Sequence, residues 1–277
     1  MQYFISLKST TISPEEKELL LKPNVGGVVL YGRNILSYET TIQLISAIKS
    51  VKSNIIIAVD EEGGVVSRFT HLLSNFSQPY IATLPLGEVT EYYKKRSNFL
   101  KELGIDLNFA PVVDVALSEN SSMYKRSYGS DLAKIIELTN ICIKEQKEVG
   151  LLSCVKHFPG HGRAVDDSHE KLPVVNITQA EFDALEYKIF EGVISSVDYV
   201  MVGHLLFPKI NSEITSVSKY WVTQVLRKTL KFKGKIISDD ICMRGLSDSV
   251  DTSSAGLFED VGFDELIITE LSHPLLR

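Results

Sequence analysis

The run Asn54-Ile55-Ile56-Ile57-Ala58-Val59-Asp60 decides the fold, because it is apolar almost without a break and ends in a carboxylate. Such short, continuous hydrophobicity is typical of a parallel strand that is covered on both faces. Similar runs recur along the whole chain. They predict eight strands, at Tyr3–Ser6, Gly27–Tyr31, Ile55–Asp60, Asp106–Asp114, Leu152–His157, Tyr199–His204, Lys235–Asp239 and Glu265–Thr269.

Longer amphipathic stretches between these runs predict helices. Thr178 is followed three residues later by Glu181, which is a capping-box signal, and Gly104 and Gly150 stand where helices are expected to end. The expected helices are Tyr38–Val51, Val89–Leu103, Asp131–Val149, Gln179–Ser195 and Lys219–Leu230. Eight strands alternating with helices over about 250 residues predict an α/β fold, the (β/α)8 TIM barrel. An open doubly wound sheet is the alternative, but no GxGxxG motif follows an early strand.

The chain has no low-complexity segment and no linker rich in Pro, Ser or Gly. We therefore expect residues 1–277 to form a single barrel domain. Only about eight residues follow the last expected strand, so the last helix of the barrel should be short or missing.

Composition narrows the class of protein. Hydrophobic residues make up 44% and charged residues 23% of the chain, as in a globular protein with a sizeable core. The formal charge of −6 argues against nucleic acid or an anionic membrane as a partner. No signal peptide and no membrane-spanning run stand out, and the three cysteines lack a CxxC spacing. We expect a cytoplasmic protein with reduced thiols and no cofactor.

Polar residues end six of the eight expected strands. Alone, each would be interpreted as a cap or a solvated residue, and for Asp240 we favour a helix cap. Six at one rim indicate a site, because the carboxyl ends of barrel strands carry the chemistry of this fold. The residues are Asp60, Asp114, Lys156-His157, His204, Asp239-Asp240 and Glu270.

The loop after the fifth strand is the densest in chemical groups, with Lys156-His157-Phe158-Pro159-Gly160-His161-Gly162 and then Asp167-Ser168-His169. A metal site is one interpretation, since His157 and His161 are four residues apart. That spacing suits a metal on a helix, which Pro159 excludes here, so we expect no metal. A carboxylate that fixes one imidazole nitrogen while the other transfers protons fits Asp167 and His169 better.

Seven segments follow one another in a recognisable order. They are Gly26-Gly27-Val28-Val29-Leu30 with Arg33-Asn34, Asp60 to Phe69, Asn108 to Val115, Arg126-Ser127-Tyr128-Gly129, Lys156 to Gly162, Asp167-Ser168-His169 with Leu172-Pro173, and Ser238-Asp239-Asp240 with Met243. In this order they resemble the single-domain β-N-acetylglucosaminidases of glycoside hydrolase family 3, bacterial enzymes of peptidoglycan recycling. The similarity runs from about Pro23 to about Gly262.

The resemblance implies an exo-acting, retaining hydrolase that releases terminal β-N-acetylglucosamine from a small carbohydrate, with N-acetylglucosaminyl-anhydromuramoyl peptides as the substrate. Asp239 would be the nucleophile, and His169, oriented by Asp167, the general acid/base. The residues implied to hold the sugar hydroxyls are Asp60, Arg68, Arg126, Lys156 and His157. His204 resembles the histidine after the family's sixth strand, and we expect it to support the pocket wall.

The chain departs from the family pattern at two places. Arg163-Ala164 stand where Asp-Thr is usual, which puts a cation beside the expected acid/base loop, and Tyr128 replaces a phenylalanine. Three alternatives to the hydrolase stay open. Phosphate could accept the sugar in place of water, as in an N-acetylglucosaminide phosphorylase. The barrel could be catalytically degraded and only bind amino sugar, or it could be a metal-dependent hydrolase.

Overall fold

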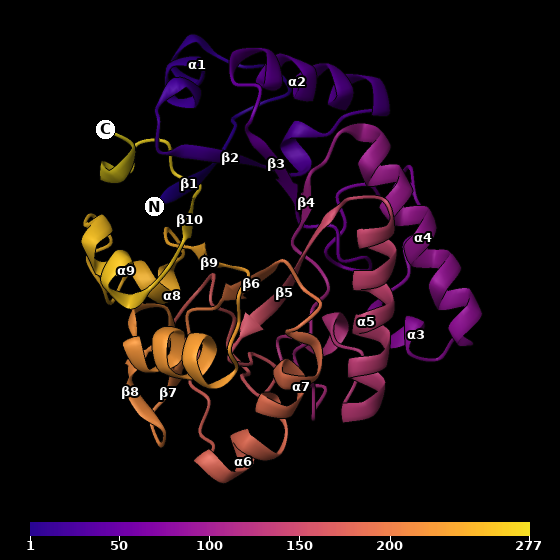
Figure 1. Cartoon of the computed structure of the whole chain (residues 1–277), viewed down its shortest axis with the longest axis vertical. Coiled ribbons are helices and arrows are strands. Elements are labelled where there is room, and N and C mark those ends of the chain that lie inside the picture. Colours follow the sequence, from indigo (N-terminus) through magenta and orange to yellow (C-terminus); the bar gives the residue numbers. More distant parts are fainter.

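The computed structural model describes every residue from Met1 to Arg277. Eight parallel strands close into a barrel in the order β1-β10-β9-β6-β5-β4-β3-β2, which confirms the expected (β/α)8 fold (Figure 1). The barrel strands are β1 (Gln2–Ser6), β2 (Val25–Leu30), β3 (Ile56–Val59), β4 (Leu107–Asn108), β5 (Leu152–Phe158), β6 (Tyr199–Val202), β9 (Lys235–Asp240) and β10 (Glu265–Ile268).

Helices surround the ring of strands (Figure 1). They are α1 (Pro14–Leu21), α2 (Tyr38–Val51), α3 (Gln78–Ile81), α4 (Leu86–Leu103), α5 (Leu132–Glu148), α6 (Gln179–Ala184), α7 (Glu186–Val193), α8 (Arg244–Ser247), α9 (Ala255–Val261) and the π-helix η4 (Tyr220–Thr229). Local sequence explains where several begin. Ser13, Ser37 and Thr178 each accept a hydrogen bond from an amide of the first turn, which satisfies a donor that the helix leaves unpaired.

The structure differs from the sequence prediction in three elements. The stretch Gln179–Ser195 is two helices rather than one, because the backbone leaves the helical region at Leu185. The fourth strand is only two residues long, and Pro111 beyond it lacks the amide proton that a longer ladder needs. A short antiparallel pair, β7 (Leu206–Phe207) and β8 (Asn211–Ile214), was not expected.

The residues after β10 include one short element. It is a 3-10 turn, Pro274–Leu276. Lys22 donates hydrogen bonds to the carbonyl oxygens of Leu276 and Arg277, which ties this segment to the end of α1.

The core has two layers. Ten residues, among them Phe4, Phe109 and Met201, fill the inside of the barrel, and a larger cluster lies between the strands and the helices. Each fully buried large side chain of this kind stabilises the fold by about 1.5–3 kcal/mol. Gly27 is required by this packing, because a Cβ there would lie 2.3 Å from the Phe4 ring.

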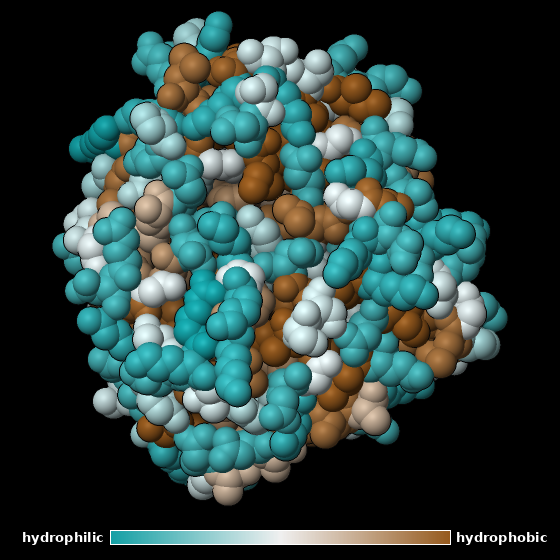
Figure 2. Space-filling model, viewed as in Figure 1, coloured by the Kyte–Doolittle hydropathy of each residue, from teal (hydrophilic) through white to brown (hydrophobic).

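Hydrophilic side chains cover most of the face in Figure 2, with smaller brown patches between them. None of the helices combines the length and the apolar character that crossing a membrane requires. Cys142 and Cys154 are buried, Cys242 is half-buried, and all three are free thiols.

Candidate active site

A cavity of about 270 Å³ lies at the carboxyl ends of the strands. Eight of the nine predicted site residues line it: Asp60, Arg68, Arg126, Lys156, His157, Asp167, His169 and Asp239. They come from β5, from β9 and from the segments that follow β3, β4 and β5, so the barrel brings together segments far apart in the sequence. A larger groove, of about 420 Å³, is lined by the loop Leu72–Phe76 and α4, and contains none of these residues.

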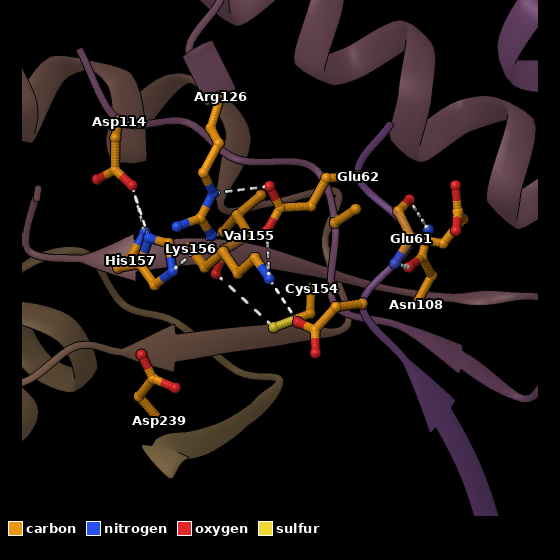
Figure 3. Close-up of polar contacts among 12 residues, drawn as sticks. Glu61, Glu62, Asn108, Asp114, Arg126, Cys154, Val155, Lys156, His157 and Asp239 are labelled. Atoms are coloured by element: carbon orange, nitrogen blue, oxygen red, sulfur yellow. Dashed lines mark hydrogen bonds and ion pairs between the residues drawn. The ribbon is translucent and has the colours of Figure 1, made fainter. Parts of the chain in front are cut away.

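Glu62 organises the floor of the cavity. It is 2% exposed, and Arg126 binds it through two hydrogen bonds, Nε to Oε2 at 2.9 Å and one terminal nitrogen to Oε1 at 2.7 Å. The Lys156 ammonium lies 2.7 Å from Oε1. Figure 3 shows the three side chains pointing toward one another. Burial acts to raise the pKa of Glu62, but the two cations lower it to about 2, so it is an anion at neutral pH.

Asp60 shares the same lysine. Its Oδ1 accepts a hydrogen bond from Lys156 at 2.6 Å, and its Oδ2 lies 3.6 Å from Arg68. Burial acts to lower the pKa of Lys156, but Asp60 and Glu62 raise it above its usual value. The lysine is therefore a charged donor, fixed between two carboxylates and held at the cavity wall.

His157 is oriented by a buried carboxylate. Its Nδ1 lies 2.7 Å from Asp114 Oδ2, and Arg126 lies 3.3 Å from its Nε2. Asp114 also accepts hydrogen bonds from the amides of His157 and His161. Burial acts to raise the pKa of Asp114, while His157 and His161 hold it below its usual value. These contacts favour the tautomer that carries its proton on Nδ1.

Asp239 lines the cavity without a cationic partner, as Asp240 does, but it has fewer hydrogen bonds than Asp240. Its Oδ1 accepts a hydrogen bond from the amide of Asp240 at 2.8 Å, and Oδ2 accepts none from the chain. In Figure 3 it stands apart from the Glu62 cluster, and no dashed line reaches it. Burial acts to raise its pKa, but His157, His204 and the Asp240 amide hold it below its usual value. Asp239 is thus an ionised, free carboxylate on a rigid strand end.

His204 lies behind this wall and does not line the cavity. It is fully buried, its Nδ1 lies 2.7 Å from the Ser216 hydroxyl, and its Nε2 lies 3.0 Å from the Asp240 carbonyl oxygen. Burial lowers its pKa, although Asp239 acts in the opposite direction. Both nitrogens are occupied by the protein, so this placement suits support of the strand end that carries Asp239.

Two other rim residues have structural contacts. Asp240, expected to cap a helix, instead accepts hydrogen bonds from the amides of Cys242 and Thr269 and joins β9 to the end of β10. Glu270 is exposed and lies in a neighbouring depression, outside the central cavity.

The loop that carries Asp167 and His169 is more exposed to solvent than the buried residues around Glu62. The side chains are 49% and 71% exposed, and His169 Nδ1 lies 2.7 Å from Asp167 Oδ1. Partial burial acts to raise the pKa of Asp167, but hydrogen bonds from the His169 amide and ring hold it below its usual value. The pair therefore presents the imidazole Nε2 to the cavity mouth.

Arg163 does not reach that pair. Its Nε lies 2.5 Å from Glu186 Oε1, at the start of α7, and Glu186 is 4% exposed. The cation that replaces the family's usual carboxylate is thus neutralised by a buried glutamate at the stem of the loop. Gly160 packs on the same glutamate, since a Cβ there would lie 2.7 Å from Glu186 Cγ.

The metal interpretation rested on His157 and His161. The ring centroids of His157 and His161 are 5.7 Å apart, and Asp114 already binds His157 Nδ1. The structure contains no group of three or more His, Cys, Asp or Glu side chains arranged to hold a metal ion.

Sequence reasoning did not assign a site role to Glu62, Asp114 or Tyr31. Glu62 stands two residues after Asp60, and Asp114 ends a predicted strand, so both carried a positional signal. Tyr31 ends the predicted strand Gly27–Tyr31 and lines the cavity, but it was not counted among the polar strand ends.

A closed barrel with a free carboxylate beside a buried set of donors at its rim is suited to a glycosidase. The comparisons with known proteins agree. The model of the glycosyl hydrolase family 3 N-terminal domain matches residues 4–259. The β-hexosaminidase of Haemophilus influenzae is 34% identical over 276 residues, which cover 95% of this chain and 78% of that protein.

Solved structures are similar over nearly the whole chain. Native NagZ from Neisseria gonorrhoeae superposes with a TM-score of 0.89 at 28% identity, over 99% of this chain and 82% of that one. The same protein in complex with N-trifluoroacetyl-D-glucosamine gives a TM-score of 0.90 at the same identity and coverage. The chain belongs to glycosyl hydrolase family 3, and within it to the group of the bacterial β-hexosaminidases.

Proposed function

We propose that the protein is an exo-acting, retaining β-N-acetylglucosaminidase with muropeptides of peptidoglycan recycling as its natural substrates. The observation that carries the proposal is the free carboxylate of Asp239, which faces the same cavity as the Glu62 cluster and the Asp167–His169 pair. The N-acyl glucosamine bound by the Neisseria protein supports an amino sugar as the occupant.

In the first step Asp239 attacks the anomeric carbon of the terminal sugar while the bond to the leaving oxygen breaks. His169 gives its Nε2 proton to that oxygen, so the second sugar departs as a neutral alcohol. Asp167 holds Nδ1 at 2.7 Å, which leaves the other ring nitrogen free for the substrate. The product of this step is a glycosyl ester of Asp239.

In the second step the same histidine, now neutral, takes a proton from water. The water oxygen attacks the anomeric carbon, the ester bond breaks, and Asp239 is again a carboxylate. Two displacements at one carbon return the β configuration. An exposed loop suits the acid/base, because the group must accommodate first the leaving sugar and then water.

The donor cluster accounts for substrate choice. Asp60 accepts hydrogen bonds, whereas Arg68, Arg126 and Lys156 donate them, and all four have atoms at the cavity surface. A buried polar site of this kind discriminates by about 10⁴-fold against a ligand that leaves its groups unpaired. We therefore propose recognition of one terminal sugar.

Hydrolysis by the purified protein tests this function. We expect release of the aryl group from an aryl β-N-acetylglucosaminide with a kcat/KM far above that for the matching aryl glucoside, and release of N-acetylglucosamine from an anhydromuramoyl peptide. Equal kcat/KM values for the two aryl substrates, or cleavage within chains without terminal release, would contradict it. Parallel assays in phosphate and in a non-nucleophilic buffer separate hydrolysis from phosphorolysis.

The proton-transfer role has its own test. His169→Ala should lower kcat/KM by about 10²- to 10⁴-fold for substrates with basic leaving groups and much less for activated aryl substrates. Asp167→Ala should follow the same pattern more weakly. Lys171→Ala is the matched control, because Lys171 lies on the same loop and pairs with Asp166. An equal loss for every leaving group would place the acid elsewhere.

A further inference from the structure

Tyr31 is a polar residue of the cavity that the proposed chemistry does not use. It follows β2, which places it on the same rim as Asp60 and Asp239, and it lines the same cavity. Its ring packs against the cluster that fills the inside of the barrel. Tyr31 therefore borders both the apolar interior of the barrel and the cavity.

The position of Tyr31 is fixed on several sides. Its amide donates a hydrogen bond to Asn34 Oδ1 at 2.9 Å, and Asn34 is itself anchored to the carbonyl oxygens of Leu7 and Ser9. The guanidinium carbons of Arg33 and Arg68 lie over the ring, 4.8 and 5.6 Å from its centroid. Such contacts hold an aromatic ring by cation–π attraction.

The hydroxyl of Tyr31 has no hydrogen-bond partner in the chain, although it is not sealed in the core. Asp60, Asp240 and Asp239 surround it closely enough to act on its charge state. Together with burial, which is the larger effect, they raise its pKa well above the usual value for tyrosine. The phenol thus keeps its proton at neutral pH and offers an unused donor to the cavity.

We propose that Tyr31 is a substrate-binding residue whose hydroxyl donates a hydrogen bond to one hydroxyl oxygen of the terminal sugar. The inference rests on the proposed function only in that a sugar occupies the cavity. A fixed donor beside Asp60 and Asp239 is well placed to distinguish one terminal sugar from another. It would add to the donors from β5 and the loops.

The test is Tyr31→Phe, which removes one oxygen and keeps the packed ring. We expect kcat/KM for the aryl β-N-acetylglucosaminide to fall roughly tenfold, as for loss of one neutral hydrogen bond. With analogues that lack the 3-, 4- or 6-hydroxyl, the difference between variant and wild type should vanish for one analogue and persist for the others. Tyr199→Phe is the control, because its hydroxyl points to Glu265 within the interior cluster.

Unchanged kcat/KM across the panel would overturn the proposal, and so would an equal loss on every analogue, since the hydroxyl would then act on the enzyme alone. Calorimetric binding of N-acetylglucosamine keeps this result separate from the proposed function. If the wild type neither binds nor cleaves, the proposed function fails. If it does both and Tyr31→Phe is indistinguishable from it, only the role of Tyr31 is refuted.

Discussion

Glu62 and Glu265 are two buried glutamates at opposite ends of the same barrel. They are 2% and 4% exposed. Glu62, at the catalytic rim, is bound by Arg126 and Lys156, and its pKa is lowered to about 2. Glu265 begins β10 at the other end, where Oε1 receives only a 3.4 Å contact from the Tyr199 hydroxyl and Oε2 has no partner. Burial raises its pKa to about 7.

Equal burial thus gives opposite shifts, and the partners decide the sign. At the rim Glu62 stays ionised because Arg126 and Lys156 surround it. Its negative charge in turn holds these two donors at the cavity. At the far end the carboxylate of Glu265 forms no ion pair, so its ionisation destabilises the folded protein. Glu186, with Arg163 as its single cation, is intermediate: burial raises its pKa although Arg163 acts to lower it.

Removing Glu62 should have the largest effect. Glu62→Ala leaves Arg126 without its carboxylate partner, so we expect the free energy of unfolding at pH 7 to fall by about 3–5 kcal/mol. Denaturant unfolding measures it, with kcat/KM expected to fall at least as steeply. Because the folded pKa is depressed, the stabilising contribution is present above about pH 4.5 and is lost as the pH falls toward 2.

The matched variant Glu62→Gln keeps the shape and removes the charge. Its stability deficit relative to wild type should shrink as the pH falls from about 4.5 to 2. If Glu62→Gln lowers the free energy of unfolding by less than about 1 kcal/mol at pH 7, the charge of Glu62 does not stabilise the fold.

Glu265→Gln should act in the opposite direction. The folded pKa is raised, so the wild type loses stability as the pH rises from about 4.5 to about 7. We expect the variant to be more stable than wild type by about 3 kcal/mol at pH 8 and by much less at pH 5. Thermal unfolding at both pH values measures this difference. A variant that is less stable than wild type at pH 8 would mean that the charged form is paired after all.

Arg163→Ala should have the smallest effect of the three. It leaves Glu186 buried without a cation, and we expect a loss of about 1 kcal/mol at pH 7 and a few-fold lower kcat on basic leaving groups. A double-mutant cycle with Glu186→Ala should return a coupling of similar size. The exposed pair Arg244–Asp248 is the control, with 70% and 57% exposed side chains and no expected coupling. A coupling energy of zero between Arg163 and Glu186 would show that this ion pair does not order the loop.

The barrel and most of its rim residues could be predicted, because each apolar run and the polar residue at its end are adjacent in the sequence. A run such as Ile56–Val59 predicts a strand, and the residue that follows the strand lies on the rim of the barrel. The break at Leu185 and the pairing of Arg163 with Glu186 could not be predicted, since both depend on which surfaces meet after folding. Glu62 had a positional signal, whereas the free hydroxyl of Tyr31 becomes visible only once its surroundings are known.

The central claim is that Asp239 forms a covalent bond to the sugar, and direct trapping tests it most closely. An activated fluorosugar analogue of N-acetylglucosamine slows breakdown of the intermediate, so the labelled protein can be digested and the modified peptide identified by mass spectrometry. We predict one sugar, attached to Asp239, with no label in Asp239→Ala. Label on Asp240 or Glu270, or full turnover by Asp239→Ala, would contradict the account.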